Sequence, residues 1–165
     1  VTGVQTCALP IYTRFGRAAE IGARLAQLCG REPWADLVSV EAIGPKKLLD
    51  VLAVAPCTGN TLAKLANGIS DTSVTLACKA HLRNLRPIVL AVSTNDGLSG
   101  NAANLAVMLR RKNHFFVPFG QDNPETKACS LVARLDLLPA AIGAALEGRQ
   151  LEPILLEKSV QVPVG

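Results

Sequence analysis

The sequence predicts an α/β protein built on a doubly wound, parallel sheet, and three observations carry that prediction. Short apolar runs that suit buried strands alternate with longer segments whose apolar residues recur at helical spacing. Turns dense in hydroxyl and amide side chains follow the apolar runs, as at Pro56–Thr61 after Val51–Ala55. The chain has 165 residues, which is enough for one domain with a buried core. Alternation of this kind forms right-handed βαβ units whose helices cover both faces of one sheet.

In the first half of the chain we expect a helix, two strands and two helices, over Gly16–Cys29, Leu37–Ile43, Leu49–Ala55, Asn60–Ile69 and Asp71–Asn84. The first helix carries an apolar stripe at every third or fourth position and ends at Gly30. Both strands are short apolar runs, and the breaker pair Gly44-Pro45 separates them. The last helix begins with Asp71-Thr72-Ser73, residues that suit a helix N-terminus.

In the second half we expect a strand, a helix, a strand, a helix and an edge strand, over Pro87–Val92, Asn101–Lys112, Phe115–Phe119, Leu131–Leu146 and Leu151–Leu156. Proline opens the first of these strands, where a missing N–H costs least. Three cations at 110–112 close the following helix, because they meet the negative end of its dipole. Pro139 is expected to kink or divide the last helix. The polar turns 56–61, 93–97 and 120–124 are then predicted to lie along one rim of the sheet.

Composition and charge exclude several classes of function. The net charge is +4, the basic residues are scattered, and aromatic residues make up only 4% of the chain. That leaves no basic, aromatic surface on which nucleic-acid bases stack. No apolar run approaches the roughly 18 residues that span a bilayer, and no segment has the pattern of a secretory leader. We therefore expect no nucleic-acid or membrane partner and a cytoplasmic location.

Cysteine and histidine usage excludes metal sites and common nucleophilic triads. The five cysteines are an odd number without paired CxxC spacing, which argues against a disulfide framework and against zinc. The two histidines, His81 and His114, are each expected to be surface or core residues. We expect no metal site.

The turn Pro56–Thr61 is the strongest candidate for a binding site. Its hydroxyl and amide groups, a glycine through which a ligand can approach the backbone, and the N-terminus of the following helix suit a phosphorylated cofactor. Capping of that helix by Thr58 or Asn60 explains the same residues equally well. The second polar turn, Ser93–Gly97, is predicted to converge with the first on one pocket.

Three further features each allow two interpretations. Cys57, near a helix N-terminus, is either a nucleophilic or redox thiol or a small side chain beneath a ligand. Lys79 and Arg83, one helical turn apart, either face an anionic ligand or form a solvated face. The apolar stripe of Leu62, Leu65 and Ile69 either packs on the sheet or mediates self-association.

The two ends of the chain differ from the rest. Residues 1–11 resemble a translated sequencing-adapter read-through, so we expect residues 1–12 to be a non-native lead-in. Residues 13–157 are expected to form a single domain that lacks its first strand and the phosphate loop after it. Residues 158–165 are expected to be a tail.

From Thr13 to about Glu157 the chain resembles the B subunits of dipicolinate synthases, a flavoprotein-like family of endospore-forming bacteria. The matching stretches are Thr13–Gly16, Gly44-Pro45, Ala55-Pro56, Thr58–Thr61, Ala63–Asn67, Lys79-Ala80, Leu82–Asn84, Arg86-Pro87, Ser93–Leu98, Phe116–Asp122 and Ser130–Ala133. In the wider superfamily of phosphopantothenoylcysteine decarboxylases and flavin prenyltransferases, a Pro-x-Ser/Thr-x-x-Thr turn contacts the flavin. Residues 56–61 match that pattern. The decarboxylase sequence Pro-x-Met-Asn is replaced here by Ser93–Gly97, so decarboxylation is not implied.

The resemblance implies a Rossmann-like or flavodoxin-like, three-layer fold, FMN as cofactor and, as partner, the A subunit of dipicolinate synthase, which binds NADP. It implies cofactor contacts at Pro56, Cys57, Thr58, Gly59, Asn60, Thr61, Ser93, Thr94, Asn95 and Asp96, with Asn60 as the catalytic candidate. The implied reaction is oxidation of a dihydrodipicolinate-type precursor to pyridine-2,6-dicarboxylate, a small anion, during sporulation. Homo-oligomers are implied as well. The alternatives are a stand-alone FMN enzyme acting on a small carboxylate and a non-catalytic partner subunit.

Overall fold

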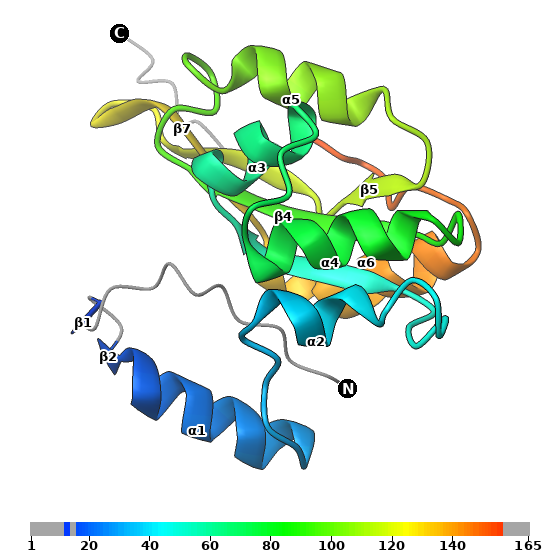
Figure 1. Cartoon of the computed structure of the whole chain (residues 1–165). Coiled ribbons are helices and arrows are strands. Elements are labelled where there is room, and N and C mark those ends of the chain that lie inside the picture. Colours follow the sequence, from blue (N-terminus) through cyan, green and yellow to red (C-terminus); the bar gives the residue numbers. More distant parts are fainter. Residues whose placement is uncertain (1–11, 14–15, 157–165) are drawn as a thin grey trace, which may run out of the picture. The chain divides into compact units, whose positions relative to one another are not determined.

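The computed structural model describes residues 12–13 and 16–156, which form two compact units (Figure 1). The first unit consists of Val1–Asp50 and Gly68–Arg86, and the second consists of Val51–Asn67 and Pro87–Gly165. The predicted lead-in and tail lie outside the described residues, apart from Tyr12. The single domain expected over 13–157 stays a prediction.

The first unit is mainly helical. It contains the two-residue strands β1 (Tyr12–Thr13) and β2 (Gly16–Arg17), and the helices α1 (Ala18–Cys29), α2 (Leu37–Glu41) and α4 (Ser73–Leu82). As predicted, α1 ends at Gly30, whose φ of 66° is left-handed and therefore suits glycine. Thr72 caps α4 by accepting a hydrogen bond from the Thr75 N–H, as the sequence Asp71-Thr72-Ser73 indicated.

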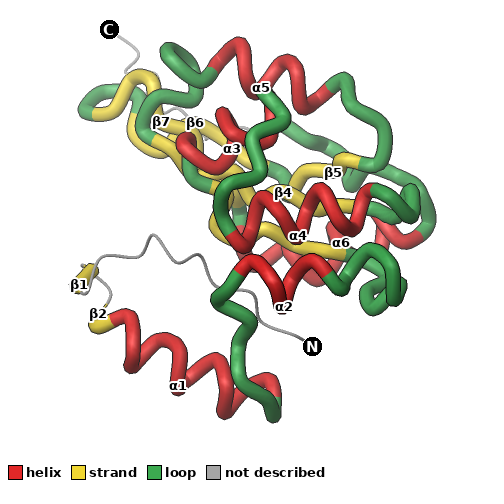
Figure 2. Tube along the Cα trace, viewed as in Figure 1, coloured by secondary structure: helices red, strands yellow, loops and turns green. Residues whose placement is uncertain are grey.

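The strand predicted over Leu37–Ile43 is wrong, because this segment forms α2. The Asp36 carboxylate accepts a hydrogen bond from the Ser39 N–H at 2.8 Å and so caps a helix. Val40 and Ile43, three positions apart, are both fully buried, whereas the intervening and preceding positions are more exposed. Figure 2 shows α2 beside α4, against which it packs.

The second unit contains the sheet. Its strands are β3 (Leu52–Cys57), β4 (Ile88–Thr94), β5 (His114–Phe116), β6 (Phe119–Asn123) and β7 (Lys127–Ala133). Its helices are α3 (Gly59–Ala66), α5 (Ala102–Leu109) and α6 (Leu138–Leu146), and a short 3₁₀ helix covers Leu135–Leu137. The strand order is β3-β4-β7-β6, with β5 also paired to β4.

The centre of this sheet is β4, and its burial shows why it lies there. Ile88, Val89, Leu90, Ala91 and Val92 are all fully buried, although they point alternately to the two faces. Figure 1 shows α3 and α5 over one face and α6 over the other. The α/β fold with helices on both faces is therefore confirmed, and β3, β4 and β5 are parallel as predicted.

The antiparallel part of the sheet was not predicted. β6 and β7 form a hairpin, and β7 pairs antiparallel with the end of β4. The predicted turn 120–124 is therefore mostly strand β6, and the helix predicted from Leu131 begins only at Leu138. The turn of the hairpin is held by the Asn123 side chain, which accepts hydrogen bonds from the N–H groups of Glu125 and Thr126. The kink predicted at Pro139 is wrong, because Pro139 lies in the first turn of α6, where proline fits without distorting the helix.

Two short contacts replace the edge strand predicted over Leu151–Leu156. The Gln150 amide accepts from the Phe116 N–H and donates to the Phe116 carbonyl oxygen, both at 2.8 Å, so one side chain substitutes for a neighbouring strand beside β5. Leu155 forms a single bridge with Phe119 on β6. In the described ranges, 12–13 and 16–156, no helix is long and apolar enough to cross a membrane.

Candidate functional site

The structure brings the turns after β3 and β4 together. A Cβ atom on Gly59 would lie 2.5 Å from Thr94 Oγ1, 2.7 Å from Asn101 Nδ2 and 2.9 Å from Asp96 Oδ1. The absent side chain of Gly59 is thus explained by this contact between the two turns rather than by the approach of a ligand. We call residues 56–61 and 93–97 together the rim.

The 56–61 turn leaves its polar side chains facing outward. Thr58 is the cap of α3: its hydroxyl oxygen accepts from the Thr61 N–H at 3.4 Å, and the hydroxyl lies 3.2 Å from Thr61 Oγ1. Thr58 and Asn60 are both exposed. The Asn60 amide has no side-chain hydrogen bond within the described part of the chain. Thr58, and not Asn60, is therefore the N-cap of α3, and the Asn60 amide is available to a ligand.

Pro56 and Cys57 close β3 and precede that turn, and the Ala55–Pro56 peptide bond is cis. Cys57 is fully buried. Burial raises the pKa of the Cys57 thiol to about 12, so the thiol stays protonated near neutral pH. A raised pKa disfavours the interpretation of Cys57 as an activated nucleophile, which needs a lowered pKa, and favours that of a small, buried side chain.

The 93–97 turn directs the side chains of Thr94 and Asp96 inward. The Asp96 carboxylate accepts from the Thr94 hydroxyl at 2.5 Å and from the Asn101 amide at 2.8 Å. These two hydrogen bonds hold the pKa of Asp96 below its ordinary value of 3.8, so this carboxylate is ionised near neutral pH. Asn95 is exposed, whereas Ser93 and Thr94 end β4 and are half-buried.

A chain of amides extends this network along α5 to α3, and it was not among the predicted site residues. Asn104 donates to the Asn101 side-chain oxygen at 2.9 Å, and Asn67 donates to the Asn104 oxygen at 3.3 Å. Asn101 is buried although it is polar, so it needs such partners. The signal in the sequence is Asn101 and Asn104 at a spacing of three in an otherwise apolar helix, which puts both amides on one face.

The hairpin strand β7 anchors the 93–97 turn, and this contact was not predicted either. The Ser130 hydroxyl donates to the Thr94 carbonyl oxygen at 3.3 Å, and the Leu98 N–H donates to the Cys129 carbonyl oxygen at 3.0 Å. Gly97 lies against Leu131, whose Cδ1 would be 2.7 Å from a Cβ at that position. The turn is therefore held by a strand whose apolar end, Leu131–Ala133, the sequence pattern had assigned to a helix.

Arg111 fixes the far end of α3. Its guanidinium donates to the carbonyl oxygens of Leu65 and Ala66, at 2.9 and 2.8 Å. These are carbonyls of the last turn of α3, which have no partner within the helix. The cation thus stabilises the negative end of α3, while the opposite end begins at the rim.

Two other predictions require revision or stay untested. Of the stripe, Leu62 and Leu65 are buried in the second unit and pack there, whereas Ile69 is exposed. Self-association stays a prediction. Lys79 is exposed, with its Nζ 3.5 Å from Ser70 Oγ, and Arg83 lies at the end of α4. Both belong to the first unit, whereas the rim belongs to the second, and their contact with an anion stays a prediction.

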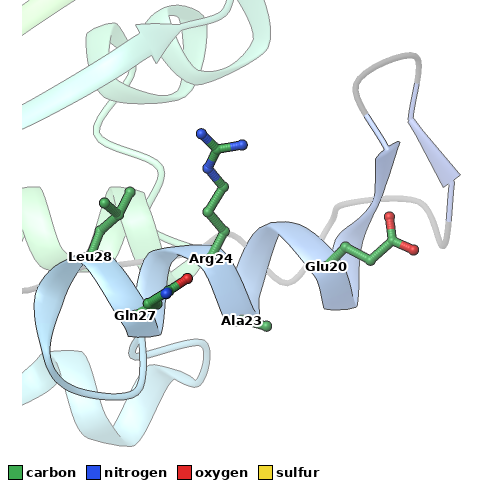
Figure 3. A pocket seen from close by; sticks show the side chains of 5 residues that line it. All are labelled: Glu20, Ala23, Arg24, Gln27 and Leu28. Atoms are coloured by element: carbon green, nitrogen blue, oxygen red, sulfur yellow. The ribbon is translucent and has the colours of Figure 1, made fainter.

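A shallow hollow along α1 contains none of the predicted site residues. Figure 3 shows its lining, which comes from one helix: Glu20, Ala23, Arg24, Gln27 and Leu28. No group of three or more His, Cys, Asp or Glu residues in the part of the chain that the structure describes is arranged to hold a metal ion. The candidate site is the rim, because there the 56–61 and 93–97 turns meet at Gly59.

Comparison with known proteins supports the resemblance seen in the sequence. The chain is 49% identical over 145 residues to the B subunit of dipicolinate synthase from Bacillus subtilis (strain 168), and the match covers 88% of this chain and 72% of that protein. The crystal structure of the B subunit of dipicolinate synthase from Bacillus halodurans matches with a TM-score of 0.83 and 43% identity, over 95% of this chain and 78% of the other.

A more distant structure shares the fold. The FMN-dependent cysteine decarboxylase SpaF matches with a TM-score of 0.57 and 21% identity, over 77% of this chain and 71% of that chain. The Flavoprotein family matches residues 10–129, which include both turns of the rim. The chain therefore belongs to the Flavoprotein family.

Proposed function

We propose that this chain is the B subunit of a dipicolinate synthase and that its rim binds flavin mononucleotide. The observation that carries the proposal is the 49% identity to the Bacillus subtilis protein over 88% of the chain. The convergence of the 56–61 and 93–97 turns at Gly59 supports the location of the site.

The proposed partner is the A subunit of the synthase, which binds NADP. Together the two proteins oxidise a dihydrodipicolinate-type precursor to pyridine-2,6-dicarboxylate. The ring loses two hydrogens, one as a hydride to the nicotinamide held by the partner and one as a proton to solvent, and it becomes aromatic. Asp96 is unsuited to take that proton, because its low pKa and its two hydrogen-bond donors keep it ionised.

The groups on the rim suit the uncharged part of a flavin. Asn60 and Asn95 expose amides, and Thr58 exposes a hydroxyl, so the rim offers both donors and acceptors to ring carbonyls and ribityl hydroxyls. Neither turn contains Lys or Arg. A flavin bound here would supply a two-electron carrier between the ring that is oxidised and the nicotinamide of the partner. The proposed role of Asn60 is to orient the reacting ring by a hydrogen bond from its amide.

The remaining partners follow from the product. Pyridine-2,6-dicarboxylate is a dianion, so cations that contact it stabilise the complex. Lys79 and Arg83, one helical turn apart at the end of α4, either contact such an anion or form a solvated face. We also propose that the protein self-associates, through surfaces other than the buried Leu62 and Leu65.

The test is reconstitution with the A subunit. The purified chain should quench the fluorescence of added FMN, and dipicolinate should form, with reduction of NADP, only when both proteins are present. Asn60→Ala should lower both the affinity for FMN and the rate. Gln27→Ala, which removes an exposed amide from α1, is the matched control and should change neither.

The outcomes separate the alternatives. Turnover of a small carboxylate by this chain and FMN without the A subunit would instead show a stand-alone flavin enzyme. Full activity of the pair without any flavin binding would show a non-catalytic partner. Absence of activity of the pair, in the presence of bound FMN, would contradict the proposed reaction but not the cofactor.

A further inference from the structure

The side-chain amides of Asn67, Asn104 and Asn101 form a chain that runs from the end of α3 to Asp96. Asn67 donates to Asn104 Oδ1 at 3.3 Å, and Asn104 donates to Asn101 Oδ1 at 2.9 Å. Asn101 in turn donates to Asp96 Oδ2 at 2.8 Å. Each amide donates toward the carboxylate, so the chain has one direction.

The two ends of the chain fix this direction. The Asp96 carboxylate only accepts hydrogen bonds, so Asn101 must present its NH₂ group to Asp96 and its oxygen to Asn104. At the other end, Asn67 also donates to the Ala63 carbonyl oxygen at 2.8 Å, and a carbonyl likewise only accepts. Neither Asn101 nor Asn104 can therefore turn its amide round alone without placing two oxygens or two NH₂ groups face to face.

Asn101 is the member through which the chain reaches the rim. It is buried, and its Nδ2 lies 2.7 Å from the position that a Cβ on Gly59 would take. Thr94 Oγ1, which donates to the other oxygen of Asp96, lies 2.5 Å from the same position. A rotated Asn101 amide would turn its oxygen toward the carboxylate and repel it, and the turn that carries Asp96 would then move away from Gly59.

We propose that Asn104 is a positioning residue of the rim, which fixes the direction of the Asn101 amide and thereby the surface that the two turns present to a ligand. The inference rests on the proposed flavin site and deepens it. Arg111 joins the ends of α3 and α5 independently, through the carbonyl oxygens of Leu65 and Ala66. A change in the direction of the amide chain therefore affects the rim without separating the two helices.

The decisive substitution is Asn104→Asp, which keeps the shape of the side chain but replaces its donor by an oxygen. Asn101 would then lie between two carboxylates with one NH₂ group to offer, so one carboxylate must face its oxygen. We expect the affinity for FMN, measured by fluorescence quenching, to fall about tenfold. Asn113→Asp adds the same charge beside Ile88, at the opposite end of β4 from the rim, and should leave the affinity unchanged. Equal affinity of Asn104→Asp and wild type would overturn the proposal.

A second substitution tests the direction of the chain by rescue. In Asp96→Asn/Asn104→Asp the carboxylate lies at the other end, so Asn101 can donate to it and accept from the new amide at position 96. Every hydrogen bond is then kept with the chain reversed, and the net charge is that of the wild type. We expect an affinity for FMN within about threefold of the wild type. A double variant as weak as Asn104→Asp would overturn the proposal, because a loss of packing at Asn104 is not corrected by a change at Asp96.

The same comparison by urea denaturation needs no flavin. The midpoint should be lower in Asn104→Asp than in the wild type and should recover in the double variant. Where Asn104→Asp does not fold, a folded double variant is the same rescue, and an unfolded one overturns the proposal. A wild-type chain that does not bind FMN refutes the proposed function, whereas the urea measurements still decide whether Asn104 is coupled to Asp96.

Discussion

The turns after β3 and β4 are both rich in hydroxyl and amide side chains, but they differ in what those side chains contact. In the 56–61 turn, Thr58 caps a helix and Asn60 is exposed to solvent. In the 93–97 turn, Thr94 and Asp96 bond to each other and to Asn101. The first turn thus exposes Thr58 and Asn60, and the second uses Thr94 and Asp96 to hold the structure and exposes only Asn95.

The cause of this difference lies in the segment after each turn. After β3 the chain enters α3 within two residues, so its side chains stand on the outer side of a helix start. After β4 the chain makes a longer loop before α5, and that loop packs on the antiparallel strand β7 through Gly97 and Leu131. Polar residues at the end of a strand therefore indicate a site only together with the partners that the fold gives them.

Closing the space at Gly59 should have the largest effect, because it forces the two turns apart. In Gly59→Ala the added Cβ would lie 2.5 Å from Thr94 Oγ1 and 2.7 Å from Asn101 Nδ2, well inside normal contact. We expect the free energy of unfolding to fall by about 2–3 kcal/mol, which urea denaturation would measure.

Gly143→Ala is the matched control. A Cβ on Gly143 in α6 meets nothing within 4 Å, so alanine should stabilise the helix by about 0.5–1 kcal/mol. A loss of stability in both variants, or in neither, would contradict the role assigned to the Gly59 contact.

A fall in pH should destabilise the 93–97 turn, because it contains the carboxylate of Asp96. The 56–61 turn contains no Asp or Glu and should not respond. The hydrogen bonds from Thr94 and Asn101 lower the pKa of Asp96 below 3.8, so the folded state binds the proton less readily than the unfolded state. Asp96 therefore contributes stability above pH 4, and this contribution is lost as the pH falls through the lowered pKa.

The measurement is the pH dependence of unfolding between about pH 5 and pH 2, where this linkage acts. Asp96→Asn should flatten the acid limb of the curve. An acid limb as steep as that of the wild type in Asp96→Asn would mean that other carboxylates cause the acid sensitivity.

Removing the cap of α3 should have a smaller effect and act on the 56–61 turn alone. Thr58→Ala deletes the oxygen that accepts from the Thr61 N–H, and we expect a loss of about 1 kcal/mol in the free energy of unfolding. Thr58→Ser keeps that oxygen and should restore most of the stability. A serine variant as unstable as the alanine variant would show that the methyl group, not the cap, matters at this position.

The local signals in the sequence were reliable where a helix cap or a buried parallel strand was involved. Gly30, Thr72 and the run before Thr94 determined α1, α4 and β4 within a few residues. The strand predicted over Leu37–Ile43 was wrong, because the pattern of a short apolar run does not distinguish a strand from a helix. Asp36, which caps the helix, is the signal that favours α2. The helix predicted from Leu131 was wrong over Leu131–Ala133, which ends β7, because apolar residues continue from this strand into α6.

For the site, too, some features followed from the sequence pattern and others did not. The sequence predicted that the turns after β3 and β4 converge, because parallel strands bring their carboxyl ends to one edge. It did not reveal that Asp96 would bond inward, since that depends on Asn101, which lies at the start of the next helix. The anchoring of the turn by Cys129 and Ser130 could not be predicted, because pairing with β7 is set by tertiary contacts.

The smallest effect on activity is expected at Cys57, which is the last residue of β3. Because burial raises the pKa of its thiol to about 12, the thiolate fraction at pH 8 is on the order of 10⁻⁴. Iodoacetamide should therefore label the half-buried Cys29 and Cys129 in the folded protein and reach Cys57 only after unfolding, which mass spectrometry of the peptides would show. Cys57→Ala should cost about 1 kcal/mol of stability for the lost packing and leave the rate of NADP reduction by the reconstituted pair within about twofold of wild type. Rapid labelling of Cys57 in the folded chain, or loss of activity in a folded Cys57→Ala variant, would restore a chemical role for this thiol.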